Sequence, residues 1–211
     1  MGWYTRSQQE ASDSPDKEKV DVSDLASQVE NKALSSGYNM KMYHGTWQGG
    51  FNTFNEATHF SPEKEYAERY QSPSASSMGT SRRTVTKQQT YEVYMKMERP
   101  FDTRVKRCRD LYANEFYGVY GRTPLSESGI PDWTDGVDMY EWISEKHPEF
   151  DGLILDEGGE PEGNSVRSRP CSYVPMSPNQ VKSANPVTYD DSGKAIPLSS
   201  RFDQSNSDIR Y

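Results

Sequence analysis

The chain is poor in aliphatic residues but rich in aromatic ones, and this balance limits what it can fold into. Leu, Ile, Val and Phe together make up about 15% of its 211 residues, a share typical of partly disordered chains. Against this stand 14 Tyr, 7 Phe and 4 Trp, which make 12% of the residues aromatic. We therefore expect a small aromatic core in one domain, surrounded by polar segments that need not be ordered.

Composition also excludes several classes of protein. No apolar run approaches the ~18 residues of a membrane-spanning helix, and the first residues lack the charged-then-apolar pattern of a signal peptide. We expect no membrane partner and no secretion by a signal peptide. Cys108 and Cys171 are too few for a disulfide framework, and three scattered His residues predict no metal site. A net charge of −8 argues against broad binding to phosphate backbones.

The chain divides into three parts by composition. Residues 1–38 form a polar arm, either partly disordered or carrying one short helix. Residues 39–185 form the domain, with polar insertions at 72–90 and 101–137. Residues 186–211 are a polar tail, and the sequence leaves open whether the arm and the tail are ordered.

Hydrophobic periodicity predicts strands and short helices. The clearest strand runs from Thr90 to Pro100, where apolar and polar residues alternate. Shorter strands are expected in MKMYH, THFS, FDGLILD and CSYVPMSP. Helices are expected near 109–116, over 139–147, and after Ser61, which would be the N-cap with Pro62 in the first turn. These elements indicate an α+β fold built around antiparallel sheets.

A His-Gly-Thr tripeptide marks the first candidate site. His44 stands where an expected strand runs into a glycine-rich turn, and Gly45 would let a ligand approach the backbone closely. Thr46 adds a hydroxyl group. Taken alone the tripeptide is weak evidence, and a structural histidine is the alternative.

The residues around this tripeptide give it a context. YHGTW, the strand THFS and a helix ending in Tyr70 resemble the NAD-binding core shared by diphtheria-toxin-like toxins and poly-ADP-ribose polymerases. The likeness is closer to phage-encoded ADP-ribosyltransferase domains of polyvalent and head-associated proteins. Further motifs of that family follow in the same order over 40–211: VYMKMERP, FDGLIL, SYVPMSPNQVKSA and IPLSSRFDQSNSDIRY. The resemblance implies split antiparallel sheets, a few short helices and polar flanking arms.

The resemblance also implies a set of NAD-binding residues. They are His44, Gly45, Thr46, His59, Ser61 and Tyr70. His44 would hydrogen-bond a ribose hydroxyl, and the Gly45 backbone would pair with the nicotinamide amide. Tyr70 would stack on the nicotinamide ring, with His59 in the second stacking position, where the polymerases place Tyr. Ser61 would shape the strand end beneath the ribose, or would only cap the helix.

The resemblance departs at one catalytic position. In the polymerases a Glu lies eight residues before a strand-following Gln, and counting back from Gln180 gives Ser172. A serine supplies no full negative charge, which implies single transfers or no activity. Gln180 would contact the ribose or the acceptor, or would only satisfy backbone groups at a strand end. Asp156 and Glu157 are spare carboxylates, or parts of a turn.

The function that follows is a toxin-like, NAD-dependent mono-ADP-ribosyltransferase. It would transfer ADP-ribose from NAD to a host protein or nucleic acid and release nicotinamide, with NAD as co-substrate and no metal. The alternative is a catalytically inactive ADP-ribosyltransferase fold that serves as a phage structural or interaction protein. The phage analogy places the protein in the host cytoplasm, or packaged in the virion with other virion components.

Overall fold

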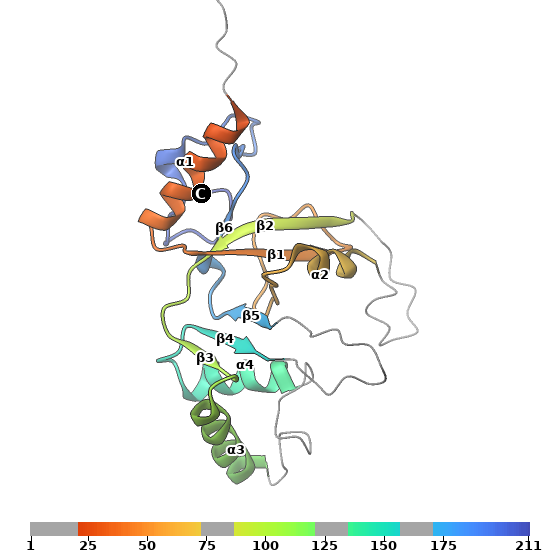
Figure 1. Ribbon diagram of the computed structural model, residues 1–211, viewed down its shortest axis with the longest axis vertical. Coiled ribbons are helices and arrows are strands. Elements are labelled where there is room, and N and C mark those ends of the chain that lie inside the picture. Colours follow the sequence, from red (N-terminus) through yellow and green to blue (C-terminus); the bar gives the residue numbers. More distant parts are fainter. Residues whose placement is uncertain (1–20, 73–86, 121–134, 157–170) are drawn as a thin grey trace, which may run out of the picture.

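The computed structural model describes residues 21–72, 87–120, 135–156 and 171–211, which form two small sheets with helices around them (Figure 1). Sheet 1 has the order β1-β2-β6, formed by Met40–Thr46, Gln89–Met95 and Val181–Ser183. Sheet 2 has the order β3-β4-β5, formed by Pro100–Asp102, Gly152–Leu155 and Ser172–Pro175. The expected α+β fold with split sheets is confirmed. The rest of the chain, including Glu157 and parts of both expected insertions, lies outside the described residues.

One strand pair differs from the expected antiparallel pattern. β3 and β4 are parallel, whereas the β1–β2, β2–β6 and β4–β5 pairs are antiparallel. Parallel neighbours need a long crossover, and here the chain between them carries two helices.

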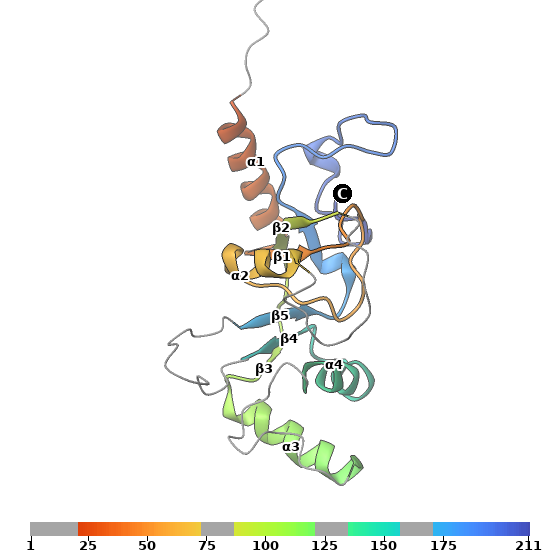
Figure 2. The same ribbon diagram turned by 90° about the vertical axis from the view of Figure 1, so that its right-hand side faces the viewer.

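Helices surround the two sheets (Figure 2). They are α1 (Val22–Ser35), α2 (Lys64–Glu68) with the 3-10 turn η1 (Arg69–Gln71), α3 (Lys106–Tyr120) and α4 (Asp135–Lys146). Two further 3-10 turns are η3 (Pro178–Gln180) and η4 (Leu198–Ser200). α1 lies beside sheet 1 with the C-terminal segment, α3 and α4 lie beyond sheet 2, and α2 packs against β1.

The segment THFS is not a regular strand, and Ser61 is not the N-cap of α2. Phe60 pairs with Tyr173 of β5, and Ser61 pairs with Tyr43 of β1, so these two residues bond to both sheets. The backbone of Ser61 must stay extended to make that pair. α2 therefore begins later, at Lys64, although the Ser61 hydroxyl still accepts from the N–H of Glu63 at 3.0 Å.

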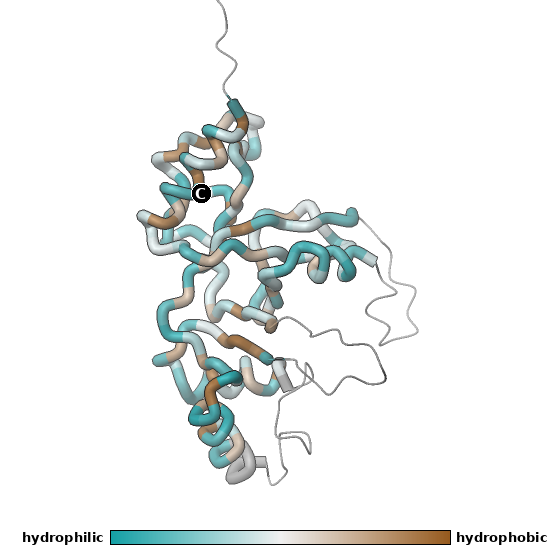
Figure 3. The backbone as a smooth tube through the Cα atoms, in the orientation of Figure 1, coloured by the Kyte–Doolittle hydropathy of each residue, from teal (hydrophilic) through white to brown (hydrophobic). Residues whose placement is uncertain are grey.

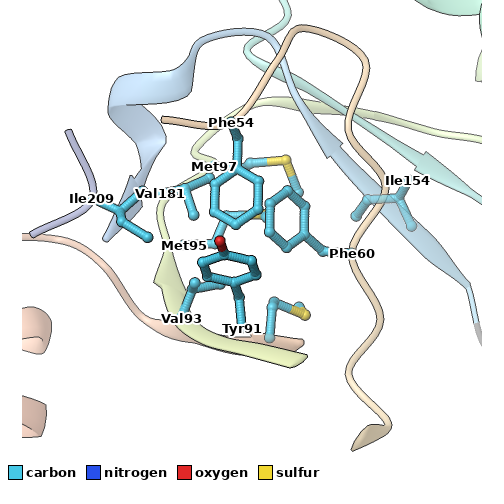
Figure 4. Packing of buried hydrophobic residues seen from close by; sticks show 10 residues of the cluster. Phe54, Phe60, Tyr91, Val93, Met95, Met97, Ile154, Val181 and Ile209 are labelled. Carbon is cyan, nitrogen blue, oxygen red and sulfur yellow. The ribbon is translucent and has the colours of Figure 1, made fainter. Parts of the chain in front are cut away.

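The core is built from aromatic rings, as the composition predicts. Around sheet 1, Phe54 packs edge-on against Phe60 and Tyr91, with ring centroids 4.8 and 5.2 Å apart (Figure 4). Around sheet 2, Trp142 packs edge-on against Phe101 and Tyr112. The last two residues belong to β3 and α3, so the start of the expected polar insertion 101–137 is part of the core.

The arm and the tail contribute ordered structure as well. Val29 and Ala33 of α1 are buried in one cluster with Tyr94 of β2 and Phe202 of the C-terminal segment. Asp21 caps α1 by accepting from the N–H of Ser23. The limits of the domain at 39 and 185 stay a prediction.

Two buried cations tie the C-terminal segment to β6. Arg201 donates to the carbonyl of Ser183 at 2.8 Å, and Lys182 donates to the carbonyl of Asn206 at 2.5 Å. Burial lowers the pKa of Lys182 to about 8 and that of Arg201 to about 10.

The hydropathy of the elements differs, since α2 is mostly hydrophilic and β4 is strongly hydrophobic (Figure 3). Among the described residues, no helix combines the length and apolar character needed to cross a membrane.

Candidate active site

His44 lies on β1 within the aromatic core. Its ring packs against Phe54 and Phe60, with centroids 5.3 and 5.5 Å away. Its Nδ1 lies 2.8 Å from the main-chain oxygen of His59. A carbonyl oxygen only accepts, so Nδ1 carries the hydrogen and Nε2 of the neutral ring is left as an acceptor. Burial, more than the other effects, lowers the pKa of His44 and keeps the ring neutral.

A cavity of about 410 Å³ opens beside this ring, within the size range of ligand pockets. His44 and Thr46 line it, as the sequence predicts for binding residues. The other lining residues are Gln48, Phe51, Thr53, Asn55 and Thr58. None of these seven carries a charge when His44 is neutral, so the cavity suits hydroxyl and amide groups. Sequence reasoning missed these loop residues, because isolated polar residues in a loop carry no specific signal.

Gly45 presents main-chain groups at the free edge of β1. Tyr43 exchanges hydrogen bonds with Ser61 on the side away from β2, and main-chain direction alternates along an antiparallel strand. Gly45, two residues on, therefore directs its N–H and C=O to the same side. No described residue hydrogen-bonds these two groups. The result is an adjacent donor and acceptor next to His44.

Helix α2 explains why residue 45 is a glycine. A Cβ atom at this position would lie well inside 3.0 Å of the Ala67 carbonyl oxygen. The glycine therefore admits the helix backbone against one face of β1, in addition to any role toward a ligand.

Three of the expected site residues, His59, Ser61 and Ser172, are not among the residues that line the cavity. The register that pairs Phe60 with Tyr173 places Ser61 across from Ser172, and both serines are buried. The His59 ring lies near the start of α4, because a Cβ on Gly136 would be 3.4 Å from its Cε1. Burial lowers the pKa of His59. The expected stacking role of His59 on a ligand stays a prediction.

Asp156 brings a carboxylate to the Ser172 end of sheet 2. Its main-chain N–H donates to the hydroxyl of Thr103 at 2.8 Å, which fixes the end of β4. The register that pairs Leu155 with Ser172 places Asp156 opposite Cys171. Burial raises the pKa of Cys171, and the charge of Asp156 raises it further. A raised pKa keeps Cys171 a thiol, which is the less nucleophilic form.

Tyr70 lies on η1, just after α2, and its side chain is 40% exposed. Its hydroxyl lies 3.1 Å from that of Tyr66, and the two rings meet edge-on. It is not among the residues that line the cavity. The next residue, Gln71, hydrogen-bonds the hydroxyl of Thr90 and holds η1 against sheet 1.

Gln180 is placed away from this cavity, where the chain crosses between the sheets. Its Nε2 donates to the carbonyls of Lys96 and Asp151, at 2.9 and 2.7 Å. Its Oε1 accepts from the N–H of Ser177 at 2.8 Å. Every hydrogen of the amide is thus bonded to backbone, which matches the structural alternative for this residue and leaves no N–H group for a ribose.

The described residues contain no group of three or more His, Cys, Asp or Glu side chains that could hold a metal ion. The split sheets, with His-Gly-Thr at the end of β1 and a bridging segment between the sheets, define the ADP-ribosyltransferase class of folds. Residues 35–188, which are most of the chain, match the family model described as ADP-ribosyltransferase in polyvalent proteins, and the chain belongs to this family. Neither a curated protein nor a solved structure matches the chain significantly.

Proposed function

We propose that the protein transfers single ADP-ribose units from NAD to a macromolecular acceptor and releases nicotinamide. The observation that carries the proposal is the pair of open main-chain groups on Gly45 beside the free Nε2 of His44. A carboxamide needs one donor and one acceptor side by side, and a ribose hydroxyl needs an acceptor for its hydrogen. Both needs are met at one edge of β1, next to an uncharged cavity.

The main role of these residues in the reaction would be to position the dinucleotide. The carbon–nitrogen bond between ribose and nicotinamide breaks, nicotinamide leaves with the electron pair, and positive charge develops on the ribose. The acceptor nucleophile then bonds to the same carbon and loses its proton. Gly45 would fix the carboxamide and His44 the ribose, so that the leaving group and the reacting carbon are held in one orientation.

Charge stabilisation is the weaker part of the site. Ser172 is buried and brings no negative charge, so the carboxylate of Asp156 is the group that we propose for opposing the ribose cation. Asp102 at the end of β3 also lies near Cys171, but its carboxylate is bound to Arg104. The absence of an acidic residue at position 172 also favours a second candidate, an inactive fold that acts through binding alone.

The test is NAD binding by calorimetry on the full chain, followed by transfer of label from NAD. His44→Asn is the sharpest variant, because an Asn amide can replace the Nδ1–H bond to His59 but offers no acceptor in place of Nε2. We expect it to weaken NAD binding about tenfold or more, measured at a temperature where the variant is folded, because loss of the buried ring also lowers stability. His147→Asn is the control, since His147 hydrogen-bonds Glu115 and Glu149 near α3 and α4.

Three outcomes distinguish the candidates. Binding with transfer of label to lysate macromolecules supports the transferase. Release of free ADP-ribose without an acceptor indicates an NAD hydrolase instead. No binding, or binding that His44→Asn leaves unchanged, supports the inactive fold. The family description places such domains in polyvalent proteins. By analogy with phage proteins, we propose that the protein acts on host macromolecules in the host cytoplasm or is packaged in the virion.

A further inference from the structure

The N-terminal part of β2 extends beyond the region in which β2 pairs with β6. β2 pairs with β1 along its whole length, but it pairs with β6 only from Val93 to Met95. The last bond on this side joins the N–H of Ala184 to the carbonyl of Glu92, at 2.9 Å. Beyond this point no described strand lies along the β6 side of β2.

The main chain of Thr90 faces this open edge. The bond from Ala184 shows that Glu92 directs its carbonyl away from β1, and alternation gives Thr90, two residues earlier, the same direction. No described residue hydrogen-bonds the N–H or the C=O of Thr90. Its side chain is engaged elsewhere, because its hydroxyl accepts from Gln71.

A cleft of about 370 Å³ lies along the same edge. Its lining includes Gln89 and Thr90 of β2 and, from the C-terminal segment, Asn185, Val187, Thr188 and Tyr189. The C-terminal segment offers apolar surface, since Val187 is 38% and Tyr189 56% exposed. The cleft shares Phe51 with the His44 cavity, so the two hollows lie on either side of that residue.

We propose that this cleft binds an extended segment of an acceptor protein, which adds to β2 as a strand. A free N–H and C=O from one residue of an exposed strand are the groups that a peptide backbone recognises, while Val187 and Tyr189 would contact its alternate side chains. Its identification as the acceptor rests on the proposed function. Gly45 and Thr90 are opposite each other in the β1–β2 register, so the NAD groups and the peptide would occupy the two edges of one ribbon.

The charges around the cleft favour a peptide over a nucleic acid. Arg210 is already bound to Asp191 and Asp208, at 2.7 and 2.6 Å. Lys87 is the cation of the cleft that has no carboxylate partner among the described residues. One unpaired cation on a chain of net charge −8 is poor support for a phosphate backbone, but it suits an acidic side chain of the peptide.

The test uses random displayed peptides of about ten residues, the upper length of an ordinary strand, selected on the full chain without NAD. Thr90→Pro removes the outward N–H, and proline is tolerated where that group faces away from the neighbouring strand. Thr90→Val is the matched control, because it also loses the hydroxyl bonded to Gln71 but keeps the N–H. We expect selected peptides to bind the wild type and Thr90→Val equally and Thr90→Pro about tenfold more weakly.

A second measurement keeps the proposal testable if Thr90→Pro fails to fold. Single N-methylation of alternate peptide residues should weaken binding to the wild type about tenfold, because it removes backbone donors from the peptide. Peptides that bind regardless of both changes, or the absence of any enriched peptide, would overturn the proposal. So would a short single-stranded oligonucleotide that binds in the cleft and is lost with Lys87→Gln. Peptide binding without NAD binding would support the proposal that the cleft binds a peptide, and it would refute only the proposed function.

Discussion

The Nδ1–H of His44 donates to the main-chain carbonyl of His59 across 2.8 Å, and this bond fixes the tautomer of the buried ring. The same segment that carries His59 bonds β1 to β5, so the orientation of the imidazole depends on how the two sheets are joined. The side chain is therefore both a part of the core and the acceptor that the cavity offers.

NAD affinity should fall at acid pH and stay constant at neutral and alkaline pH. Burial lowers the pKa of His44 below its ordinary value of 6.5, so the ring stays neutral at and above that pH and is protonated only below it. Calorimetry between about pH 8 and pH 5 should show constant affinity at first and a fall only at the acid end. Hydrogen bonds to Glu149 and Glu115 outweigh burial and raise the pKa of His147. If NAD affinity begins to fall above pH 6.5, and this fall is absent in His147→Gln, the pH dependence comes from His147 and contradicts the prediction for His44.

Gly45→Ala should disrupt the packing of α2 as well as NAD binding. Its Cβ would overlap the carbonyl of Ala67, so the helix must move or the chain must lose stability. We expect a drop of about 2 kcal/mol or more in the free energy of unfolding, measured with denaturant. Gly193→Ala is the comparison, because its φ of +80° is strained but its Cβ would meet nothing within 4 Å. Equal losses of NAD affinity in both variants would contradict the local role of Gly45.

Gln180→Ala should act on stability and not on chemistry. It leaves the carbonyl of Lys96 and the N–H of Ser177 without their partner and removes one of two bonds to the carbonyl of Asp151, which also accepts from Met176. We expect a loss of about 3 kcal/mol in the free energy of unfolding. At a temperature where the variant is folded, its NAD affinity and turnover should match the wild type. A lower turnover with unchanged stability would show that the amide has a catalytic role after all.

Asp156→Asn should lower the rate of transfer about tenfold or more while leaving NAD affinity nearly unchanged. The substitution keeps the size of the side chain and the backbone bond to Thr103, but removes the negative charge near Cys171. Ser172→Ala is the matched change at the neighbouring position and should cost less, because a hydroxyl carries no charge. If Ser172→Ala has the larger effect on turnover, the charge does not come from Asp156.

Ile209→Ala should weaken NAD binding although the residue lies outside the part of the chain that matches the family model. Its N–H donates to the carbonyl of Asn52, next to the cavity loop, and its side chain packs in the core with Phe54. Ile196→Ala is the control, since it also removes a buried Ile from the C-terminal segment. Both should lose about 2–5 kcal/mol of stability, but only Ile209→Ala should raise the dissociation constant of NAD, by about threefold or more. Ile209→Val should restore most of the affinity.

The sequence predicted well those features that depend on local pattern. The aromatic content predicted an aromatic core, and an apolar face with Met139, Trp142 and Ile143 marked α4. Alternation marked β2, but the predicted strand continued to Pro100, whereas β2 ends at Met95 and Pro100 begins β3. The ordered motifs gave the family, because their spacing reflects the order of strands along the chain.

Tertiary contacts decided the rest. Nothing local distinguishes Gln180 as a ligand-binding residue from Gln180 as a clamp between Lys96 and Asp151, since both partners are distant in sequence. The same holds for Arg201 and Ile209, polar-tail residues that are buried because β6 and the Asn52 loop offer them partners. The amino-acid pattern determines which strands and helices form, since their hydrogen bonds and periodicity are local. Contacts between distant parts of the chain decide which side chains can bind a ligand. The reason is that buried polar groups form hydrogen bonds within the protein, and only the remaining groups are available to a ligand.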